Sequence, residues 1–267
     1  MSAALGSLSP ARRRFAVGTV VTLAVAVATI VALAVVRRDP PVRPVAQDRA
    51  GPVLLVPGYG GSTAALEVLG DALEADGRDV RIVEASGSGT GDLRDRAAEL
   101  GSAVDRALEE TGAPSVDVVG YSAGGVVLRL YVADLGGGST VRRAVTLASP
   151  HHGTDLAALA RSLGRRSCHE ACRQLDPESD LLRELNARDE TPAGPVWTAV
   201  WTEDDQTVVP PDSGVLEGAR SFSVQSVCPG LVVPHGDVPR TPAVIALVEG
   251  ALATPRPVAP DPSGCAQ

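Results

Sequence analysis

A serine between two glycines, directly after an apolar run, constrains the fold of this chain more than any other feature. The run Gly120-Tyr121-Ser122-Ala123-Gly124 separates a predicted strand, Val116–Gly120, from a predicted helix, Gly124–Asp134. Glycine on each side lets the backbone turn sharply and keeps side chains away from the serine hydroxyl. Because glycine, serine and alanine are common here, the pentapeptide alone could occur by accident. Its position between strand and helix predicts a sharp turn that presents Ser122 as a nucleophile.

Short apolar runs alternate with longer amphipathic stretches from Pro52 onward, a pattern typical of βαβ units and a parallel sheet. The predicted strands are Val53–Pro57, Val80–Glu84, Val116–Gly120, Arg143–Leu147, Val196–Trp201 and Ser221–Val227. The predicted helices are Ala64–Ala75, Leu93–Glu110, Gly124–Asp134 and Pro242–Leu252. We therefore expect an α/β fold over residues 52–253, with a mostly parallel six-stranded sheet and helices on both faces.

One stretch, residues 155–195, interrupts this alternation with two cysteines, many charges and no convincing strand. In open α/β sheets, ligands bind beyond the carboxyl ends of the strands. An insertion after the strand that ends at Leu147 would lie beside such a site and could form a lid. Residues 254–267 form a proline-rich tail.

The first 38 residues have the composition of a membrane-targeting segment. Arginines flank an apolar run at 15–36. As a helix rising about 1.5 Å per residue, this run spans roughly 33 Å, which matches a bilayer core of about 30 Å. We expect a retained signal anchor, with a cleaved signal ending near Ala32-Leu33-Ala34, or a buried helix, as alternatives. An anchor or a signal would place the body outside the cytoplasm, after a tether at 39–51.

Four cysteines lie in the body of the chain, an even number that indicates two disulfides in an exported protein. Three pairings are possible. We favour Cys168 with Cys172, which closes a tight loop, and Cys228 with Cys265, which ties down the tail. A zinc site of Cys168, Cys172 and His169 is the alternative, although it lacks a second pair of ligands.

Charge and composition narrow the range of partners. The chain has 24 Lys and Arg against 32 Asp and Glu, and a net charge of −8 argues against nucleic acid. His151 and His152 are adjacent, so their side chains point in different directions and are poorly placed to chelate one ion. We expect a structural or pocket-rim role for them, no metal and no cofactor. We also expect a monomer that meets the membrane through its N-terminal helix.

A serine hydroxyl becomes a good nucleophile when a base takes its proton and a third group orients that base. Of the four histidines, only His235 follows the fifth predicted strand. It stands in the loop Val233–Asp237, where a lone histidine is more often a surface residue. Asp204 and Asp205 follow the carboxyl end of that strand, and we favour Asp205, with Asp204 as a surface charge. Together with Ser122, these residues complete the order serine, aspartate, histidine.

Acyl transfer also needs two N–H donors for the oxygen that becomes negatively charged. One is expected at the residue after the nucleophile, Ala123. The second is expected in the glycine-rich loop Pro57–Gly61, and we favour the main chain of Tyr59. A tight turn without a catalytic role is the alternative interpretation of this loop.

Several of these segments resemble the lipase class 2 group of bacterial α/β-hydrolases. They are Val56–Gly61, Val118–Gly125, Val145–Thr154, Asp205–Val208 and His235-Gly236. The resemblance implies an α/β-hydrolase fold, hydrolysis of triacylglycerols or simpler carboxylic esters without a cofactor, and a triad of Ser122, Asp205 and His235. The family's first loop usually begins His-Gly, where this chain has Pro57-Gly58, and Tyr121 replaces a common histidine. These departures leave the pocket shape and the preferred acyl chain open.

We therefore expect a secreted or membrane-anchored carboxylic ester hydrolase that acts through an acyl-enzyme. Two other functions could use the same features. An acyltransferase would use the triad with an alcohol other than water as the acceptor. A catalytically silent fold would serve as a binding module at the cell surface.

Overall fold

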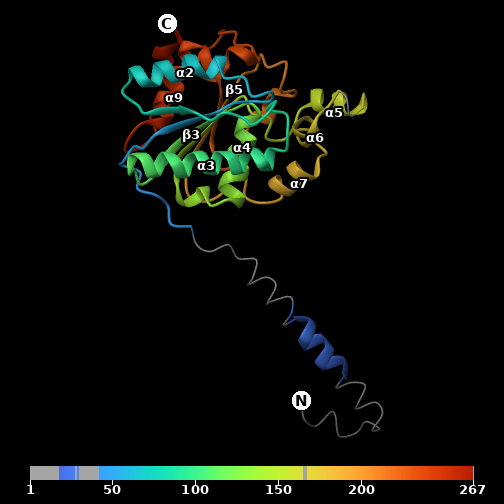
Figure 1. Ribbon diagram of the computed structural model, residues 1–267. Coiled ribbons are helices and arrows are strands. Elements are labelled where there is room, and N and C mark those ends of the chain that lie inside the picture. The colour runs from blue at the N-terminus through green and yellow to red at the C-terminus, as the bar shows by residue number, and fades with distance from the viewer. Residues whose placement is uncertain (1–17, 28, 30–41, 165–166, 267) are drawn as a thin grey trace. The chain divides into compact units, whose positions relative to one another are not determined.

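The computed structural model describes residues 18–27, 29, 42–164 and 167–266 (Figure 1). Contacts divide the chain into two units, Met1–Val42 and Arg43–Gln267. In the first unit, residues 18–27 are helical. Within the described ranges, no helix has both the length and the apolar character needed to cross a membrane. Most of the predicted segment 1–38 lies outside these ranges, so the anchor, the signal and the boundaries at 38, 51 and 253 remain predictions.

In the described part of the second unit, six strands run parallel in the order β2-β1-β3-β4-β5-β6. They are β1 (Val53–Val56), β2 (Val80–Ile82), β3 (Val116–Tyr121), β4 (Val141–Leu147), β5 (Val196–Trp201) and β6 (Arg220–Ser223). The predicted α/β class is confirmed. The last strand is shorter than predicted because the Ser223 side chain accepts a hydrogen bond from the Ser226 N–H and caps a helical turn, α8 (Val224–Val227).

The four helices predicted from the sequence cover the two faces of the sheet. They are α2 (Ala64–Ala75), α3 (Leu93–Thr111), α4 (Ala123–Asp134) and α9 (Pro242–Leu252). Leu54 and Val118 pack in one core with α3 and α4, whereas Val53 and Val119 pack in the other with α2 and α9. This alternation follows the two-residue period of a strand. Both faces of β3 are therefore covered, and Figure 1 shows the helices on either side of the sheet.

The remaining helices in the described residues are short. The 155–195 insertion holds α5 (Asp155–Ser162), α6 (Glu170–Gln174) and α7 (Asp180–Asn186). The 3-10 helices are η1 (Gly137–Ser139), η2 (Pro211–Gly214), η3 (His235–Arg240) and η4 (Pro262–Ala266). The insertion has no strand in its described residues, in agreement with its sequence.

A buried ionic network joins β3 and β4 to two distant segments near the amino ends of the strands. Arg142 donates through Nε and Nη2 to the two carboxylate oxygens of Asp117, at 2.8 and 2.5 Å, and both residues are fully buried. Arg142 also donates to the carbonyl oxygens of Gln47 at 3.1 Å and Leu252 at 2.9 Å. Arg78 pairs with the same carboxylate at 2.5 Å. The network thus fastens the segment before β1 and the end of α9 to the sheet.

Candidate active site

Ser122 lies in a sharp turn between β3 and α4, where the sequence predicts it. Its φ of 54° and ψ of −126° belong to a region that residues other than glycine seldom occupy. The turn is closely packed. A Cβ at Gly120 would lie 2.5 Å from the Gly124 carbonyl oxygen, and one at Gly124 would lie 2.3 Å from that of Val56. Because the Ser122 N–H also donates to the Leu147 carbonyl at 2.8 Å, the neighbouring strands hold this strained turn in place.

The structure brings together Ser122, His235 and Asp205. His235 Nε2 lies 3.1 Å from Ser122 Oγ, and His235 Nδ1 lies 2.7 Å from Asp205 Oδ2. The other carboxylate oxygen, Oδ1, accepts the N–H groups of Thr207 and Val208, each at 2.8 Å. The carboxylate favours the tautomer with its proton on Nδ1, which leaves a lone pair on Nε2 facing the serine hydroxyl. This geometry allows a proton to move from Ser122 to His235.

Asp204 makes a different set of contacts from its neighbour. Its Oδ2 accepts hydrogen bonds from the Val233 N–H at 2.9 Å and from Gln225 Nε2 at 2.8 Å. Thr202 Oγ1 donates to the Val233 carbonyl at 2.7 Å. The prediction of a surface charge at Asp204 is wrong, because the side chain is half-buried and holds the loop that carries His235.

Tyr121, immediately before the serine, packs on His235. Their ring centroids are 5.3 Å apart, and the tyrosine hydroxyl donates to the His235 carbonyl at 3.0 Å. Burial, followed by the nearby charge of Asp205, raises the pKa of Tyr121 to about 12, so the hydroxyl stays protonated as a donor. The sequence marked Tyr121 only as a departure from the resembled family.

The loop after β1 lies against the serine. A Cβ at Gly58 would be 2.9 Å from Ser122 Cβ, so this close approach requires glycine. Within the described residues, the N–H groups of Tyr59 and Ala123 donate to no protein acceptor. Neither N–H group is therefore committed to another part of the described protein.

Arg96 of α3, which belongs to no recognisable sequence motif, also contacts this loop. Its side chain is buried, and it donates to the carbonyl oxygens of Pro57 at 2.6 Å and Gly58 at 3.0 Å. Its one sequence signal is its place on the apolar face of the helix, three residues after Leu93 and four before Leu100.

The insertion is fastened to elements that carry the site. Thr154, just before α5, donates through Oγ1 to the Thr207 carbonyl at 2.7 Å, in the loop that follows Asp205. Gln174, at the end of α6, accepts the Leu93 N–H at 2.8 Å and donates to Asp92 Oδ1 at 2.7 Å. These contacts join the start and the middle of the insertion to the loop after Asp205 and to the first turn of α3. Its action as a lid remains a prediction.

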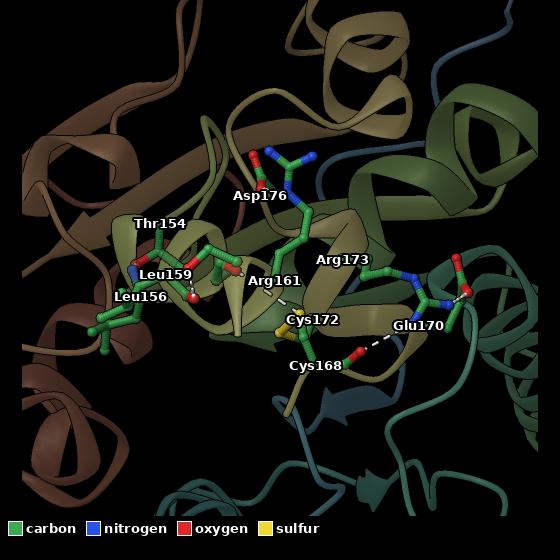
Figure 2. Close-up of a disulfide and its surroundings, with 11 residues drawn as sticks. Thr154, Leu156, Leu159, Arg161, Cys168, Glu170, Cys172, Arg173 and Asp176 are labelled. Carbon is green, nitrogen blue, oxygen red and sulfur yellow. Dashed lines mark hydrogen bonds and ion pairs between the residues drawn. A yellow bond between two sulfur atoms is a disulfide. The ribbon is translucent and has the colours of Figure 1, made fainter. Parts of the chain in front are cut away.

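One side of α5 is apolar and exposed. Leu156 and Leu159 of α5 and its C-cap residue Leu163 recur at helical spacing, with exposed fractions of 45%, 58% and 70%. Figure 2 shows Leu156 and Leu159 pointing away from the disulfide that closes this part of the insertion.

Both predicted disulfides are present. Cys168 pairs with Cys172 at a Cα separation of 5.2 Å, and Cys228 pairs with Cys265 at 5.4 Å (Figure 2 shows the first). The alternative zinc site that includes His169 is wrong, because the two cysteine sulfurs it needs are bonded to each other.

The two adjacent histidines face different partners. His151 is buried, with Nε2 3.0 Å from Thr146 Oγ1. Burial, with the charge of Arg129, holds the pKa of His151 well below its ordinary value, so its imidazole is neutral. His152 Nε2 lies 2.8 Å from Glu190 Oε1. Each histidine thus has its own protein partner.

The arrangement of the sheet and its helices agrees with comparisons to known proteins. A family model described as the alpha/beta hydrolase fold matches residues 51–164. Among solved structures, the chain is similar to Aspergillus fumigatus lipase B, with a TM-score of 0.69 and 22% identity over 82% of this chain and 57% of that one. It is also similar to the lin2722 gene product of Listeria innocua, with a TM-score of 0.55 and 18% identity over 78% of this chain and 97% of that one. The chain thus spans little more than half the length of lipase B, and it has the α/β-hydrolase fold.

Proposed function

We propose that the chain is a serine hydrolase that cleaves carboxylic esters through an acyl-enzyme intermediate. The observation that carries the proposal is the hydrogen-bonded series from Ser122 Oγ through His235 to Asp205, with contacts of 3.1 and 2.7 Å. A neutral imidazole in this position can accept a serine proton near neutral pH. The similar protein from A. fumigatus is named a lipase, which agrees with this reaction class.

The reaction has two balanced halves. Ser122 Oγ attacks the ester carbonyl carbon while His235 Nε2 takes the hydroxyl proton, and a tetrahedral intermediate forms. When this intermediate collapses, the bond to the alkoxy oxygen breaks and the Nε2 proton goes to the leaving alcohol. Water then attacks the acyl carbon, gives a proton to Nε2, and Ser122 leaves with that proton. The products are a carboxylic acid and an alcohol.

The charges that develop along this path have partners in the site. Asp205 would stabilise the imidazolium that forms when His235 takes the proton. We assign the main-chain N–H groups of Tyr59 and Ala123 to the oxyanion of each tetrahedral intermediate. Their lack of protein acceptors within the described residues supports this assignment.

For the substrate we propose a triacylglycerol or a simpler carboxylic ester, and of these we favour a lipid ester. Contiguous exposed apolar side chains often mark surfaces that meet lipids. The exposed leucines at α5 lie on a helix whose N-cap residue, Thr154, is hydrogen-bonded to the loop after Asp205. Turnover across a series of nitrophenyl esters of increasing acyl length would test this, because a lipid-ester enzyme should prefer the longer chains.

We also propose that the protein acts outside the cytoplasm, secreted or anchored through residues 1–38. The two disulfides support an oxidising location. N-terminal sequencing of protein recovered from membrane and medium fractions would distinguish an anchor from a cleaved signal.

Labelling with a fluorophosphonate probe tests the reaction class. The wild-type protein should be labelled and Ser122→Ala should not. Ser102→Ala is the matched control, because this exposed serine of α3 bonds through its hydroxyl only to its own helix. Ester turnover by folded Ser122→Ala at the wild-type rate would refute the proposal.

A further inference from the structure

We propose that Arg96 is a positioning residue that aims the Tyr59 N–H at the oxyanion through the peptide group between Gly58 and Tyr59. The inference rests on the proposed function. It begins from two contacts: Arg96 Nη1 lies 3.0 Å from the Gly58 carbonyl oxygen, and Nη2 lies 2.6 Å from that of Pro57. One guanidinium therefore holds two consecutive carbonyl groups of the loop that lies against Ser122.

Because the peptide bond is planar, the contact at the Gly58 carbonyl also affects the orientation of the Tyr59 N–H. The Gly58 carbonyl and the Tyr59 N–H belong to one trans peptide group, so they point in opposite directions. A donor that fixes the carbonyl oxygen also fixes the direction of the N–H. A charged donor on the oxygen also polarises the peptide group and makes its N–H a stronger donor.

The charge of Arg96 is itself unusual in this position. The side chain is 5% exposed, and no carboxylate of the described residues forms an ion pair with it. Burial lowers the pKa of Arg96, which reflects the cost of removing the cation from water. An apolar side chain could fill the same space at less cost. A cation behind the oxyanion loop instead favours the transition state, in which negative charge develops on the substrate oxygen.

The helix that carries Arg96 is fixed at its first turn. Asp92 caps α3 by accepting the Arg94 N–H at 2.8 Å. Gln174 of the insertion bonds to both Asp92 and the Leu93 N–H. Arg96 lies one turn further along, so its guanidinium projects from a rigid element, as accurate positioning requires.

The test compares Arg96→Met, Arg96→Lys and the control Arg94→Met in the full chain. Methionine keeps the length and apolar contacts but no donor, and lysine keeps the charge without the planar fork. Arg94 is an exposed neighbour on α3 whose Nη2 pairs with Glu184 at 2.8 Å.

We expect Arg96→Met to lower kcat for a soluble nitrophenyl ester by about 10- to 100-fold, less than the roughly 100- to 1,000-fold loss on removing an oxyanion donor itself. KM should change little, and affinity for a boronic acid that mimics the tetrahedral intermediate should fall by a similar factor. Arg96→Lys should recover part of both losses, and Arg94→Met should match the wild type.

Three results would overturn the inference. The first is wild-type kcat in folded Arg96→Met, and the second is a loss confined to KM with unchanged boronic acid affinity. The third is failure of both Arg96 variants to fold, which would assign Arg96 to the core. Failure of the proposed function looks different, because the wild-type protein itself would then lack Ser122-dependent ester turnover.

Discussion

The Tyr121 hydroxyl donates a hydrogen bond of 3.0 Å to the main-chain carbonyl of His235, across 114 positions of sequence. The residue before the proposed nucleophile thus holds the residue that would act as its base. The contact is made to the main chain, so it fixes the position of His235 without competing for either ring nitrogen.

Tyr121→Phe should keep the ring contact and lose this bond. A buried hydrogen bond contributes about 0.5–1.5 kcal/mol, so kcat/KM should fall by no more than about tenfold. Tyr131→Phe is the matched control, because its hydroxyl lies 2.9 Å from Thr140 Oγ1 and away from His235. Thermal unfolding and ester kinetics of both variants check this. Equal kinetic effects in the two variants would contradict the positioning role.

The two adjacent aspartates should differ sharply when each is changed to asparagine. If the proposed triad is right, Asp205→Asn favours the wrong imidazole tautomer at His235, and the equivalent change in a serine protease costs about 10⁴-fold in kcat. Asp204→Asn should weaken the bonds to Val233 and Gln225, lower the melting temperature and reduce kcat less than about tenfold. Steady-state kinetics of both folded variants decide the assignment. A larger loss at Asp204 would reverse it.

The buried carboxylate of Asp117 should matter for stability and not for turnover. Asp117→Asn removes the negative charge that pairs with Arg142. Breaking a buried ion pair typically lowers the free energy of unfolding by about 3–5 kcal/mol. Glu110→Gln, at the exposed ion pair with Arg81, should cost less than about 1 kcal/mol. Urea unfolding measures both, and kcat per folded molecule should stay unchanged. A small effect at Asp117 would mean that the neighbouring carbonyl groups alone satisfy the arginines.

Glu190 should make stability depend on pH. Burial raises its pKa, but hydrogen bonds from the Glu217 N–H and from His152, with the charge of Arg129, outweigh burial and hold the pKa below its ordinary value of 4.5. A carboxyl with a lowered folded pKa adds stability above about pH 4.5 and loses it as the pH falls through the folded pKa. Glu190→Gln should therefore be less stable than the wild type at neutral pH.

This difference between Glu190→Gln and the wild type should close progressively below about pH 4.5. Urea unfolding of both proteins between neutral pH and about pH 3 measures it. A difference that stays constant across this range would show that the charge of Glu190 is not its source.

The local sequence pattern was enough to predict the sheet and the main helices of this protein. The alternation of apolar runs and amphipathic stretches predicted the strands and the four main helices, because burial on a sheet or helix face imposes its period on the sequence. The turn at Ser122 was equally readable, since only glycine fits the close approaches at 120 and 124. Chain order also singled out His235. The even count of cysteines indicated two disulfides, and the short spacing of Cys168 and Cys172 favoured the pairing that is observed.

Tertiary structure alone decided which side chains meet. Asp204 and Asp205 are adjacent and chemically alike, and only the path of the loop to Val233 shows which of them reaches His235. Arg96 is one arginine among many in the sequence, and its contact with Gly58 spans 38 positions. Such contacts depend on how separate helices and strands pack and on the course of the loops that join them. Periodicity records which face of an element is buried, and it carries no information about what that face will touch.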